Sequence, residues 1–396
     1  MYSRAGRTIT DGNPDMLVPV INSVTMPPIT DRKVIVIASG KITDNSVFSN
    51  GLYQNIYLIY LMAEILGYTS FLLFNEKDEP SKRPEFLRDA RVLVMEDIVK
   101  NPIPIYLYLE VGMSIDPKMK SYLKTMGARI AKLYLGNILN IDIETPMYYH
   151  QQNFAHHVVG ETDEIWVSPH YEMHREYAAS LNHVPLNKSK IAAYLWEPFF
   201  LTHFGTKRPQ WKPSGPNEPL TILIMEPNIS FQKASTIPLL IVEAFHRLNP
   251  SIKLKVLLCN GLRFASVPYT LECFLPRLDI YREGCIELLG RMSIAEVLQK
   301  YPSAVPICHN YNNEYNYMTL EFLYSGFPVL HNSPSWKTTG YYFEEESIQG
   351  GVNALAVATT KHQSNMQSFI AQARPIMWRH SIYNPAVQDA WSSLLA

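Results

Sequence analysis

Cysteine is scarce in this chain of 396 residues, which contains only four. They are Cys259, Cys273, Cys285 and Cys308, and no two of them form a CxxC pair. This spacing argues against a disulfide framework and against a structural zinc site. We therefore expect reduced thiols that pack as small apolar side chains.

An excess of charge of one sign is also missing. Lysine and arginine number 35 and aspartate and glutamate 36, which leaves a net charge of −1. A general nucleic-acid-binding protein needs a basic surface, so we expect no nucleic-acid partner. Hydrophobic residues make up 47% of the chain, which is enough for packed cores. The length suits two domains of about 150–200 residues each.

No apolar stretch is long enough to cross a membrane. The longest, residues 55–67, contains Glu64 and falls short of the roughly 20 residues that a spanning helix needs. Near the start, Arg4 and Arg7 are not followed by an apolar segment, so the sequence predicts no signal peptide. We expect a cytoplasmic protein without a membrane span.

What the chain does contain is a regular alternation of strands and helices. Short runs rich in Val, Ile and Leu are typical of buried parallel strands, and helical spacing of apolar residues separates them. The first series has expected strands at 33–38, 69–74, 90–95, 103–109, 128–135 and 164–168, with helices at 52–67 and 117–126. The second has strands at 220–225, 253–258, 286–289, 304–308 and 327–330, with helices at 235–248, 293–301, 317–325, 364–373 and 385–395. The fold class is therefore α/β.

Proline and glycine between residues 206 and 219 divide these two series. We expect a linker there, between two Rossmann-like domains that face a cleft, where small ligands commonly bind. The predicted parts are an N-terminal arm at 1–31, a first domain at 32–205, the linker at 206–219, a second domain at 220–375 and a C-terminal helix at 376–396 that crosses back to the first domain.

One candidate site is the loop after the strand at 220–225. It contains Asn228, Ser230 and Lys233, and a helix follows. Free backbone N–H groups at a helix start and a lysine together favour a phosphate or diphosphate. The alternative is an ordinary capped loop with a solvated lysine.

A second candidate is the polar segment after the strand at 304–308. Glu314 lies in the predicted loop and Glu321 in the first turns of the next helix. A carboxylate offers two acceptor oxygens, which suits the paired hydroxyls of a sugar or a ribose. The alternative is that both are structural or solvated acids.

Residues 319–330 resemble a segment of GT-B glycosyltransferases, especially the retaining family of the glycogen-synthase and sucrose-synthase type. In that family two glutamates contact the donor sugar and the nucleotide ribose. Glu321 matches the second of them. Glu314 is the candidate for the first glutamate. Six residues lie between Glu314 and Glu321, whereas the family usually has seven, and the residue at the spacing of seven is Asn313.

The resemblance extends to other parts of the chain. It implies that Lys233 holds the donor diphosphate, although Glu226-Pro227-Asn228 stands where the family has a Gly-Arg pair. Lys233, Glu314 and Glu321 are then the expected catalytic residues. The expected donor-binding set is Asn50, Gly51, Asn228, Ser230, Lys233, Gly290, Arg291, Asn313, Tyr317, Met318, Thr319 and Glu321. The whole chain also resembles glycan-building enzymes of large chlorella-infecting viruses, which would place it in the host cytoplasm.

For the acceptor we single out His150 and His156, which precede the strand at 164–168 and could position a hydroxyl group or act as a base. Ordinary surface histidines are the alternative. Asp142-Ile143-Glu144 only weakly resembles the DxD metal motif and is expected to be a plain loop. The sequence thus predicts no metal and no cofactor besides the donor substrate.

These observations favour a glycosyltransferase that moves a sugar from a UDP- or GDP-linked donor to a glycan or glycoprotein acceptor. The resemblance implies retention of configuration without a metal ion. Two alternatives stay open, a nucleotide-sugar epimerase and a glycan-binding protein without catalytic activity.

Overall fold

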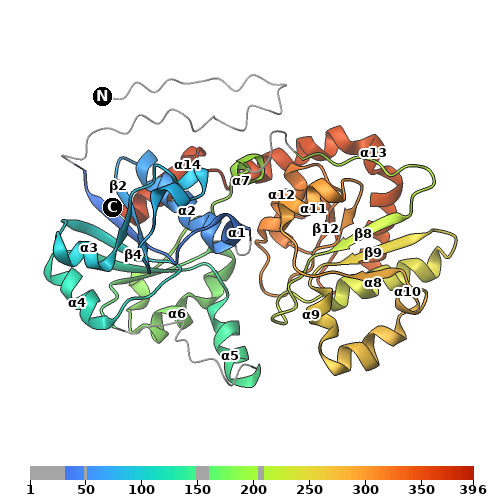
Figure 1. Cartoon of the computed structure of the whole chain (residues 1–396), viewed down its shortest axis with the longest axis horizontal. Coiled ribbons are helices and arrows are strands. Elements are labelled where there is room, and N and C mark those ends of the chain that lie inside the picture. The colour runs from blue at the N-terminus through green and yellow to red at the C-terminus, as the bar shows by residue number, and fades with distance from the viewer. Residues whose placement is uncertain (1–31, 49–50, 149–159, 204–208) are drawn as a thin grey trace. The chain divides into compact units, whose positions relative to one another are not determined.

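The computed structural model describes residues 32–48, 51–148, 160–203 and 209–396. The chain divides into two units, residues 1–31 and residues 32–396, and the second is described by itself. Figure 1 labels its helices and strands. The predicted N-terminal arm, residues 204–205 of the predicted first domain and residues 206–208 of the predicted linker lie outside the described residues, and the domain boundaries stay predictions.

A first sheet contains seven parallel strands in the order β3-β2-β1-β4-β5-β6-β7. All six strands expected in this part are present, and β7 is an addition. The strands are β1 (Val34–Ala38), β2 (Thr69–Phe74), β3 (Val92–Val94), β4 (Ile105–Glu110), β5 (Arg129–Tyr134), β6 (Glu164–Val167) and β7 (Ser189–Ile191).

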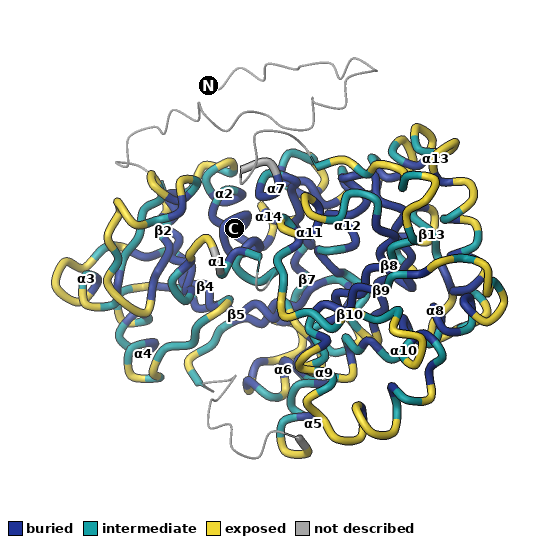
Figure 2. The backbone as a smooth tube through the Cα atoms, turned by 45° about the vertical axis from the view of Figure 1, so that its right-hand side comes forward, coloured by how far each residue is buried: buried dark blue, intermediate teal, exposed yellow. Residues whose placement is uncertain are grey.

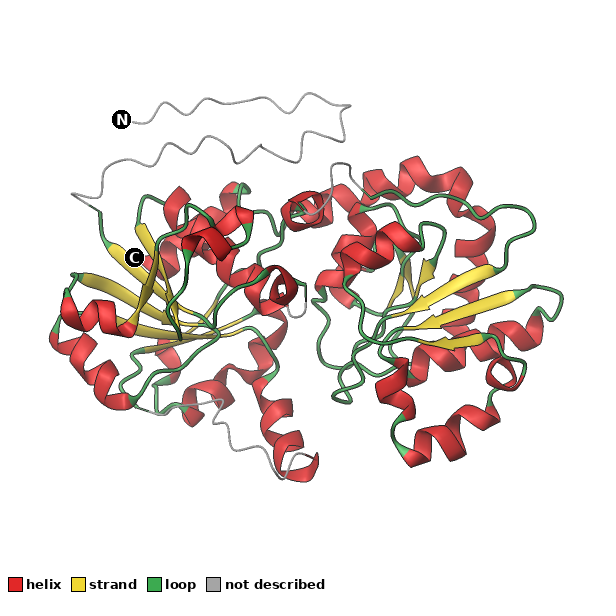
Figure 3. Ribbon diagram, viewed as in Figure 1, coloured by secondary structure: helices red, strands yellow, loops and turns green. Residues whose placement is uncertain are grey.

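Both faces of this sheet are covered, which explains why its strands are continuously apolar (Figures 2 and 3). Ile35 and Ile37 of β1 pack in one core with helix α2 (Gly51–Ile65). Val34 and Val36, which point the other way, pack in a second core with Leu123. Leu123 belongs to helix α4 (Pro117–Thr125). Alternate side chains of one strand therefore serve two helical layers.

A second sheet contains four parallel strands in the order β10-β9-β8-β11. Its strands are β8 (Leu220–Ile224), β9 (Leu254–Leu258), β10 (Ile286–Leu288) and β11 (Val305–Pro306). A bridge between Ile307 and Leu330 leads from β11 to a short pair formed by β12 (Leu330–His331) and β13 (Tyr341–Tyr342).

Helices also cover both faces of the second sheet. Ile222 and Ile224 pack with α8 (Thr236–Leu248) and with the start of α13 (Ile348–Trp378). Leu223 packs on the other face with α11 (Ile294–Lys300) and α12 (Tyr317–Tyr324). Gly351 lets α13 approach α8 closely, because a Cβ atom there would lie 2.3 Å from Ile241 Cδ1.

The remaining helices were only partly expected. The helix expected at 364–373 is the middle of the much longer α13, whereas α14 agrees with the prediction for 385–395. Among the described residues the sequence predicted none of α1 (Asp44–Val47), α3 (Met95–Lys100), α5 (Ile138–Tyr148), α6 (Arg175–Leu181), α7 (Phe199–His203), α9 (Gly261–Ala265) and α10 (Asp279–Arg282).

Several predicted helix ends are confirmed. Ser293 and Glu296 form a reciprocal capping box at the start of α11. Gly67 follows α2 with a φ of 90°, and Gly326 follows α12 with a φ of 70°, a region that glycine enters without strain.

The C-terminal helix α14 (Pro385–Leu395) packs on the first sheet, beside α2 (Figure 1). Trp391 is buried and donates a hydrogen bond of 3.0 Å from Nε1 to the carbonyl oxygen of Ala193. The last residues of the chain thus complete the core formed by the first ones described.

Each sheet has a point at which the strand order reverses. In the first sheet it lies between β1 and β4, and in the second between β8 and β11. Connections leave such neighbouring strands in opposite directions, so their loops splay apart at the carboxyl ends, where α/β proteins commonly bind ligands. The loops after β8 and β11, together with helix α12 that follows the second of them, carry eight of the twelve predicted donor-binding residues.

Candidate functional site

Polar contacts join the loops at the carboxyl edge of the second sheet. Glu226, directly beyond β8, is fully buried, and its Oε1 accepts a hydrogen bond of 3.1 Å from His309 N, beyond β11. Its carbonyl oxygen accepts a hydrogen bond of 3.4 Å from Asn260 Nδ2, beyond β9. Asn260 N in turn donates to Gly290 O, 3.1 Å away, beyond β10. Hydrogen bonds therefore connect the loops that follow all four strands at this edge of the sheet.

The loop of residues 226–235 is held in shape by its own side chains. Asn228 has a φ of 53°, and its Oδ1 accepts a hydrogen bond of 2.8 Å from Ser235 N. Ser230 Oγ accepts a hydrogen bond of 3.2 Å from Gln232 N. Asn228 and Ser230, two predicted donor-binding residues, thus shape the loop that presents Lys233.

Lys233 and Glu226 influence each other electrostatically. Burial raises the pKa of Glu226 to about 7, an effect that Lys233 and the hydrogen bond from His309 N reduce. Lys233 is half-buried, and burial lowers its pKa, whereas Glu226 acts in the opposite direction. Among the described residues, Glu226 Oε2 has no hydrogen-bond partner.

His170 lies beyond the end of β6, and the charge of Lys233 acts on its ring. Burial, and then the charge of Lys233, lower its pKa to about 3, so the ring is neutral at physiological pH. In the part of the chain that the structure describes, neither ring nitrogen has a hydrogen-bond partner. A buried imidazole with both nitrogens available can donate one hydrogen bond and accept another.

An aromatic stack holds this histidine in place. The ring of Tyr315 stacks on His170 at 4.4 Å between centroids and on Trp336 at 5.3 Å. Trp336 Nε1 donates to His380 Nε2 at 3.2 Å, in the turn before α14. The stack therefore connects a loop of the first sheet with loops of the second.

Glu321 lies on α12 and is almost fully buried. Its Oε1 accepts a hydrogen bond of 3.3 Å from Nε2 of Gln54, which lies on α2. Burial raises the pKa of Glu321 to about 7, and the contact with Gln54 partly offsets the rise. The acid thus faces the start of the helix that follows β1.

Gly51 and Tyr317 lie in the same place. A Cβ atom on Gly51 would lie 2.6 Å from Tyr317 Cδ2, so only glycine allows this approach between α2 and α12. Tyr317 donates a hydrogen bond of 2.7 Å from its hydroxyl group to Leu195 O. The structure therefore brings together Gly51 and Tyr317, two predicted donor-binding residues from distant segments of the chain.

Glu314 and Asn313 are both occupied by protein partners. The carboxylate of Glu314 accepts hydrogen bonds from Ser335 N at 3.1 Å and from Ser335 Oγ at 2.9 Å. Asn313 Oδ1 accepts a hydrogen bond from the hydroxyl group of Tyr171. In this state Glu314 fixes the turn at residues 333–336.

The other predicted donor-binding residues are distributed around this edge. Gly290 and Arg291 follow β10 and are exposed. Met318 N donates to Asn316 Oδ1 at 3.2 Å, which caps α12, and Thr319 is fully buried in the same helix. Gly290 and Arg291 lie three strands from β11, on the other side of β8 and β9.

The expectation of a plain loop at residues 142–144 is wrong. These residues belong to helix α5, and Glu144 is buried. Its Oε1 accepts a hydrogen bond of 2.9 Å from Phe231 N, in the loop that presents Lys233. Likewise, Asn137 Nδ2 donates to Asn312 O at 3.0 Å. The start of α5 therefore supports the loops beyond both β8 and β11.

Asn50, His150 and His156 lie outside the described residues, so the acceptor prediction stays untested. Across residues 32–48, 51–148, 160–203 and 209–396, no group of three or more His, Cys, Asp or Glu side chains could hold a metal ion. None of the helices described is both long and apolar enough to traverse a bilayer.

Three residues of this cluster escaped the sequence analysis: His170, Glu226 as an acid, and Gln54. For His170 a signal existed, because it is the first titratable side chain beyond the predicted strand at 164–168. Glu226 was named only because it stands, with Pro227 and Asn228, where the resembling family has a Gly-Arg pair, and its carboxyl group was given no role. Gln54 carried no signal, since its partner Glu321 is 267 residues away.

Comparison with protein families gives one match. The profile of a family described as "Protein of unknown function (DUF2827)" covers residues 35–395. The chain belongs to the DUF2827 family. Curated protein sequences give no match to this member of the family.

Solved structures of other proteins have folds similar to that of this DUF2827 protein. A glycosyltransferase from Rickettsia africae has 12% sequence identity and a TM-score of 0.58, over 92% of this chain and 98% of its own. A UDP-forming α,α-trehalose-phosphate synthase from Burkholderia xenovorans has 9% identity and a TM-score of 0.56, over 92% and 99%. HepE of Anabaena, in complex with UDP, has 11% identity and a TM-score of 0.54, over 91% and 100%.

These likenesses confirm the predicted fold class. The chain has the α/β architecture of GT-B glycosyltransferases, with Rossmann-like parallel sheets.

Proposed function

We propose that this DUF2827 protein is a glycosyltransferase that moves a sugar from a nucleotide diphosphate sugar to a glycan or glycoprotein acceptor. The observation that carries the proposal is the position of Lys233. This half-buried lysine follows β8, beside the point at which the strand order reverses, and its charge acts on His170. The charge that develops on a departing diphosphate needs a cation in a poorly hydrated site, and Lys233 would supply it.

His170 is suited to the sugar rather than to the diphosphate. Its imidazole is neutral at physiological pH and has two nitrogens without a described partner. Sugar hydroxyl groups both donate and accept hydrogen bonds, so one neutral ring can orient two of them. We assign His170 to the donor sugar, and His150 and His156 stay predictions for the acceptor.

Glu321 is suited to the ribose of the nucleotide. It is a buried acid on the same helix as Tyr317, which packs against Gly51, and its Oε1 accepts a hydrogen bond from Gln54. Two carboxyl oxygens can accept from adjacent hydroxyl groups. Gly290 and Arg291, exposed at the same edge, would contact the base.

Neighbouring structures support a nucleotide diphosphate donor. HepE of Anabaena was solved with UDP, and the synthase from Burkholderia xenovorans is described as UDP-forming. We propose UDP- or GDP-linked donors, retention of configuration and transfer without a metal ion, with Lys233 and backbone N–H groups balancing the negative charge.

A thermal-shift panel tests this function. A ligand that binds only the native state raises the apparent melting temperature by an amount set by its concentration and Kd. We expect at least one UDP- or GDP-sugar to stabilise the wild-type protein and to lose most of its effect on Lys233→Ala. If no nucleotide sugar shifts the melting temperature, the proposed function is wrong.

The two alternatives are separated by product analysis. An epimerase would convert the donor alone, whereas a transferase needs an acceptor to form a new glycoside. A glycan-binding protein without catalytic activity would bind oligosaccharides and ignore nucleotide sugars.

A further inference from the structure

A buried acid stands next to the lysine that would hold the diphosphate. Glu226 has no solvent-exposed surface, and one of its carboxyl oxygens accepts a hydrogen bond from His309 N. The other, Oε2, has no partner among the described residues. An ionised carboxylate beside Lys233 would weaken the binding of an anion to this loop. The proposed function therefore does not explain why a glutamate is buried here.

We propose that Glu226 is a positioning residue that takes up one proton when a diphosphate binds beside Lys233, so that donor affinity falls as pH rises. The inference rests on the proposed function and adds a proton to the binding step. The proton comes from solvent, settles on the Glu226 carboxyl group, and returns to solvent when the nucleotide leaves.

Of the titratable groups around Lys233, Glu226 is the one that we expect to take up the proton when a diphosphate binds. Lys233, in the same loop, supplies a positive charge. From β11, the Cys308 thiol has a pKa raised by burial and stays neutral, and burial lowers the pKa of the His309 imidazole. Glu321 also acts on Cys308, from α12, and its carboxyl group faces Gln54. His170, on which the charge of Lys233 acts, is a neutral ring at physiological pH.

Electrostatics then determines the direction of the effect. An ionised Glu226 offsets the charge of Lys233 in the free protein, but it repels a diphosphate that approaches the same lysine in a poorly hydrated site. Protonation removes that repulsion. The pKa of Glu226 is already about 7, so the bound diphosphate only has to raise it further for a proton to bind at physiological pH.

Linkage gives the expected size of the effect. If the anion raises the proton affinity of Glu226, protonation raises the anion affinity by the same factor. The affinity should therefore fall by up to about tenfold per pH unit above neutrality, where the free carboxyl group is ionised and the bound one is not.

The test is calorimetric titration with UDP-glucose and with GDP-mannose between pH 6 and 9. These sugar diphosphates lack the terminal phosphate group that titrates near pH 6 in free nucleotides. Repeating each titration in buffers of different ionisation enthalpy measures the protons taken up. For the wild type we expect weakening affinity above pH 7 and an uptake of close to one proton.

Because Lys233 itself can titrate, four proteins are compared: the wild type, Lys233→Arg, Glu226→Gln, and the double variant. An arginine stays charged throughout this pH range. We expect Lys233→Arg to keep the proton uptake of Glu226. The double variant should lose it, so that its affinity changes less with pH than that of Lys233→Arg, although Glu321, whose pKa burial also raises to about 7, still titrates. Glu197→Gln, which alters another buried acid whose pKa is raised to about 7, is the matched control and should behave as the wild type does.

Circular dichroism and melting temperatures establish that each variant is folded before it is titrated. A nucleotide sugar that binds the wild type with constant affinity and no proton uptake overturns the proposal and leaves the proposed function standing. The same holds if Lys233→Arg alone abolishes the uptake. If neither sugar nucleotide binds at any pH, both the inference and the proposed function are wrong.

Discussion

Among the residues that the structure describes, three buried glutamates have a strongly raised pKa: Glu197, Glu226 and Glu321. In each, burial is the main reason for a pKa of about 7. Glu226 and Glu321 belong to the candidate site. Glu197 instead accepts hydrogen bonds from Ser381 Oγ at 2.5 Å and Ile382 N at 2.9 Å, and so joins the segment after β7 to the turn before α14.

Glu197 makes the stability of the protein depend on pH. Its pKa is raised from 4.5 to about 7 on folding, so the native state holds the proton more tightly than the unfolded chain. The cost of ionising it in the native state is absent below pH 4.5, grows as pH rises, and is complete above pH 7, where it reaches up to about 3 kcal/mol. We expect the melting temperature of Glu197→Gln, relative to the wild type, to increase steadily from pH 4.5 to pH 8.

Other titrating groups are common to both proteins and cancel in this difference. A difference in melting temperature that stays constant across the pH range would contradict the assignment of the raised pKa to Glu197.

Lys233 and Glu321 carry the proposed transfer. We expect Lys233→Ala and Glu321→Ala each to lower kcat/KM at least about tenfold, equivalent to about 1.4 kcal/mol of transition-state stabilisation. Lys255→Ala removes an exposed lysine of the same sheet and should leave the rate unchanged. Wild-type rates in the folded Lys233 and Glu321 variants would refute their roles.

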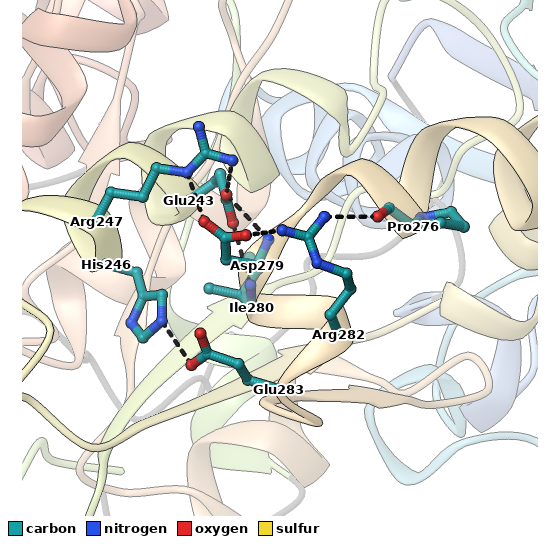
Figure 4. A network of polar contacts seen from close by, with 8 residues as sticks. All are labelled: Glu243, His246, Arg247, Pro276, Asp279, Ile280, Arg282 and Glu283. Carbon is teal, nitrogen blue, oxygen red and sulfur yellow. Dashed lines mark hydrogen bonds and ion pairs between the residues drawn. The ribbon is translucent and has the colours of Figure 1, made fainter.

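Among the elements, α8 and α10 are joined by a network of charged side chains (Figure 4). The buried carboxylate of Glu243, on α8, accepts hydrogen bonds from Asp279 N at 3.0 Å and Ile280 N at 3.1 Å, at the start of α10. Arg247, one turn later on α8, binds both Glu243 and Asp279. One acid thus caps the short helix that leads into β10.

Removing this cap should destabilise the second sheet. We expect Glu243→Ala to lower the free energy of unfolding by about 1–3 kcal/mol, because two backbone N–H groups lose their acceptor. Urea denaturation measures the loss. Glu287→Ala, which breaks an exposed pair with Lys255, is the control and should change the midpoint little. Equal effects of the two substitutions would show that the cap contributes nothing.

The elements that could be predicted are those with strong local signals. Runs rich in Val, Ile and Leu indicated nearly every strand, and helical spacing of apolar residues indicated α2, α4, α8, α11 and α12. Helix α5 was missed because its apolar residues show little helical periodicity, and α6 and α7, with 7 and 5 residues, are too short for a periodic pattern. The helix α13 was predicted too short, since polar residues interrupt its apolar face.

At the scale of the whole molecule, the C-terminal helix completes the core of the first sheet. Trp391 packs edge-to-face on Trp166, with 6.2 Å between ring centroids, and both are buried. We expect Trp391→Ala to destabilise the protein by about 3–5 kcal/mol because it leaves a large cavity.

Trp391→Phe keeps most of the packing and loses the hydrogen bond to Ala193 O, so it should cost clearly less. Chemical denaturation of the two variants checks this order. A loss no larger for alanine than for phenylalanine would mean that α14 adds little to this core.

The candidate site could be predicted only as far as single segments allow. The loop of Lys233 and the helix of Glu321 were recognisable because each carries its own pattern of strand, loop and helix. The approach of Gly51 to Tyr317 and the hydrogen bond from Gln54 to Glu321 join residues far apart in the chain, and no local pattern predicts them. The same is true of the influence of Lys233 on His170.

The measurement that tests the central claim most directly is a crystal structure of this protein with the UDP- or GDP-sugar that gives the largest thermal shift. The account predicts the diphosphate within hydrogen-bond distance of Lys233 Nζ, with the ribose at Glu321 and the sugar at His170. A nucleotide sugar bound anywhere else, with the loop of residues 226–235 unoccupied, would contradict it.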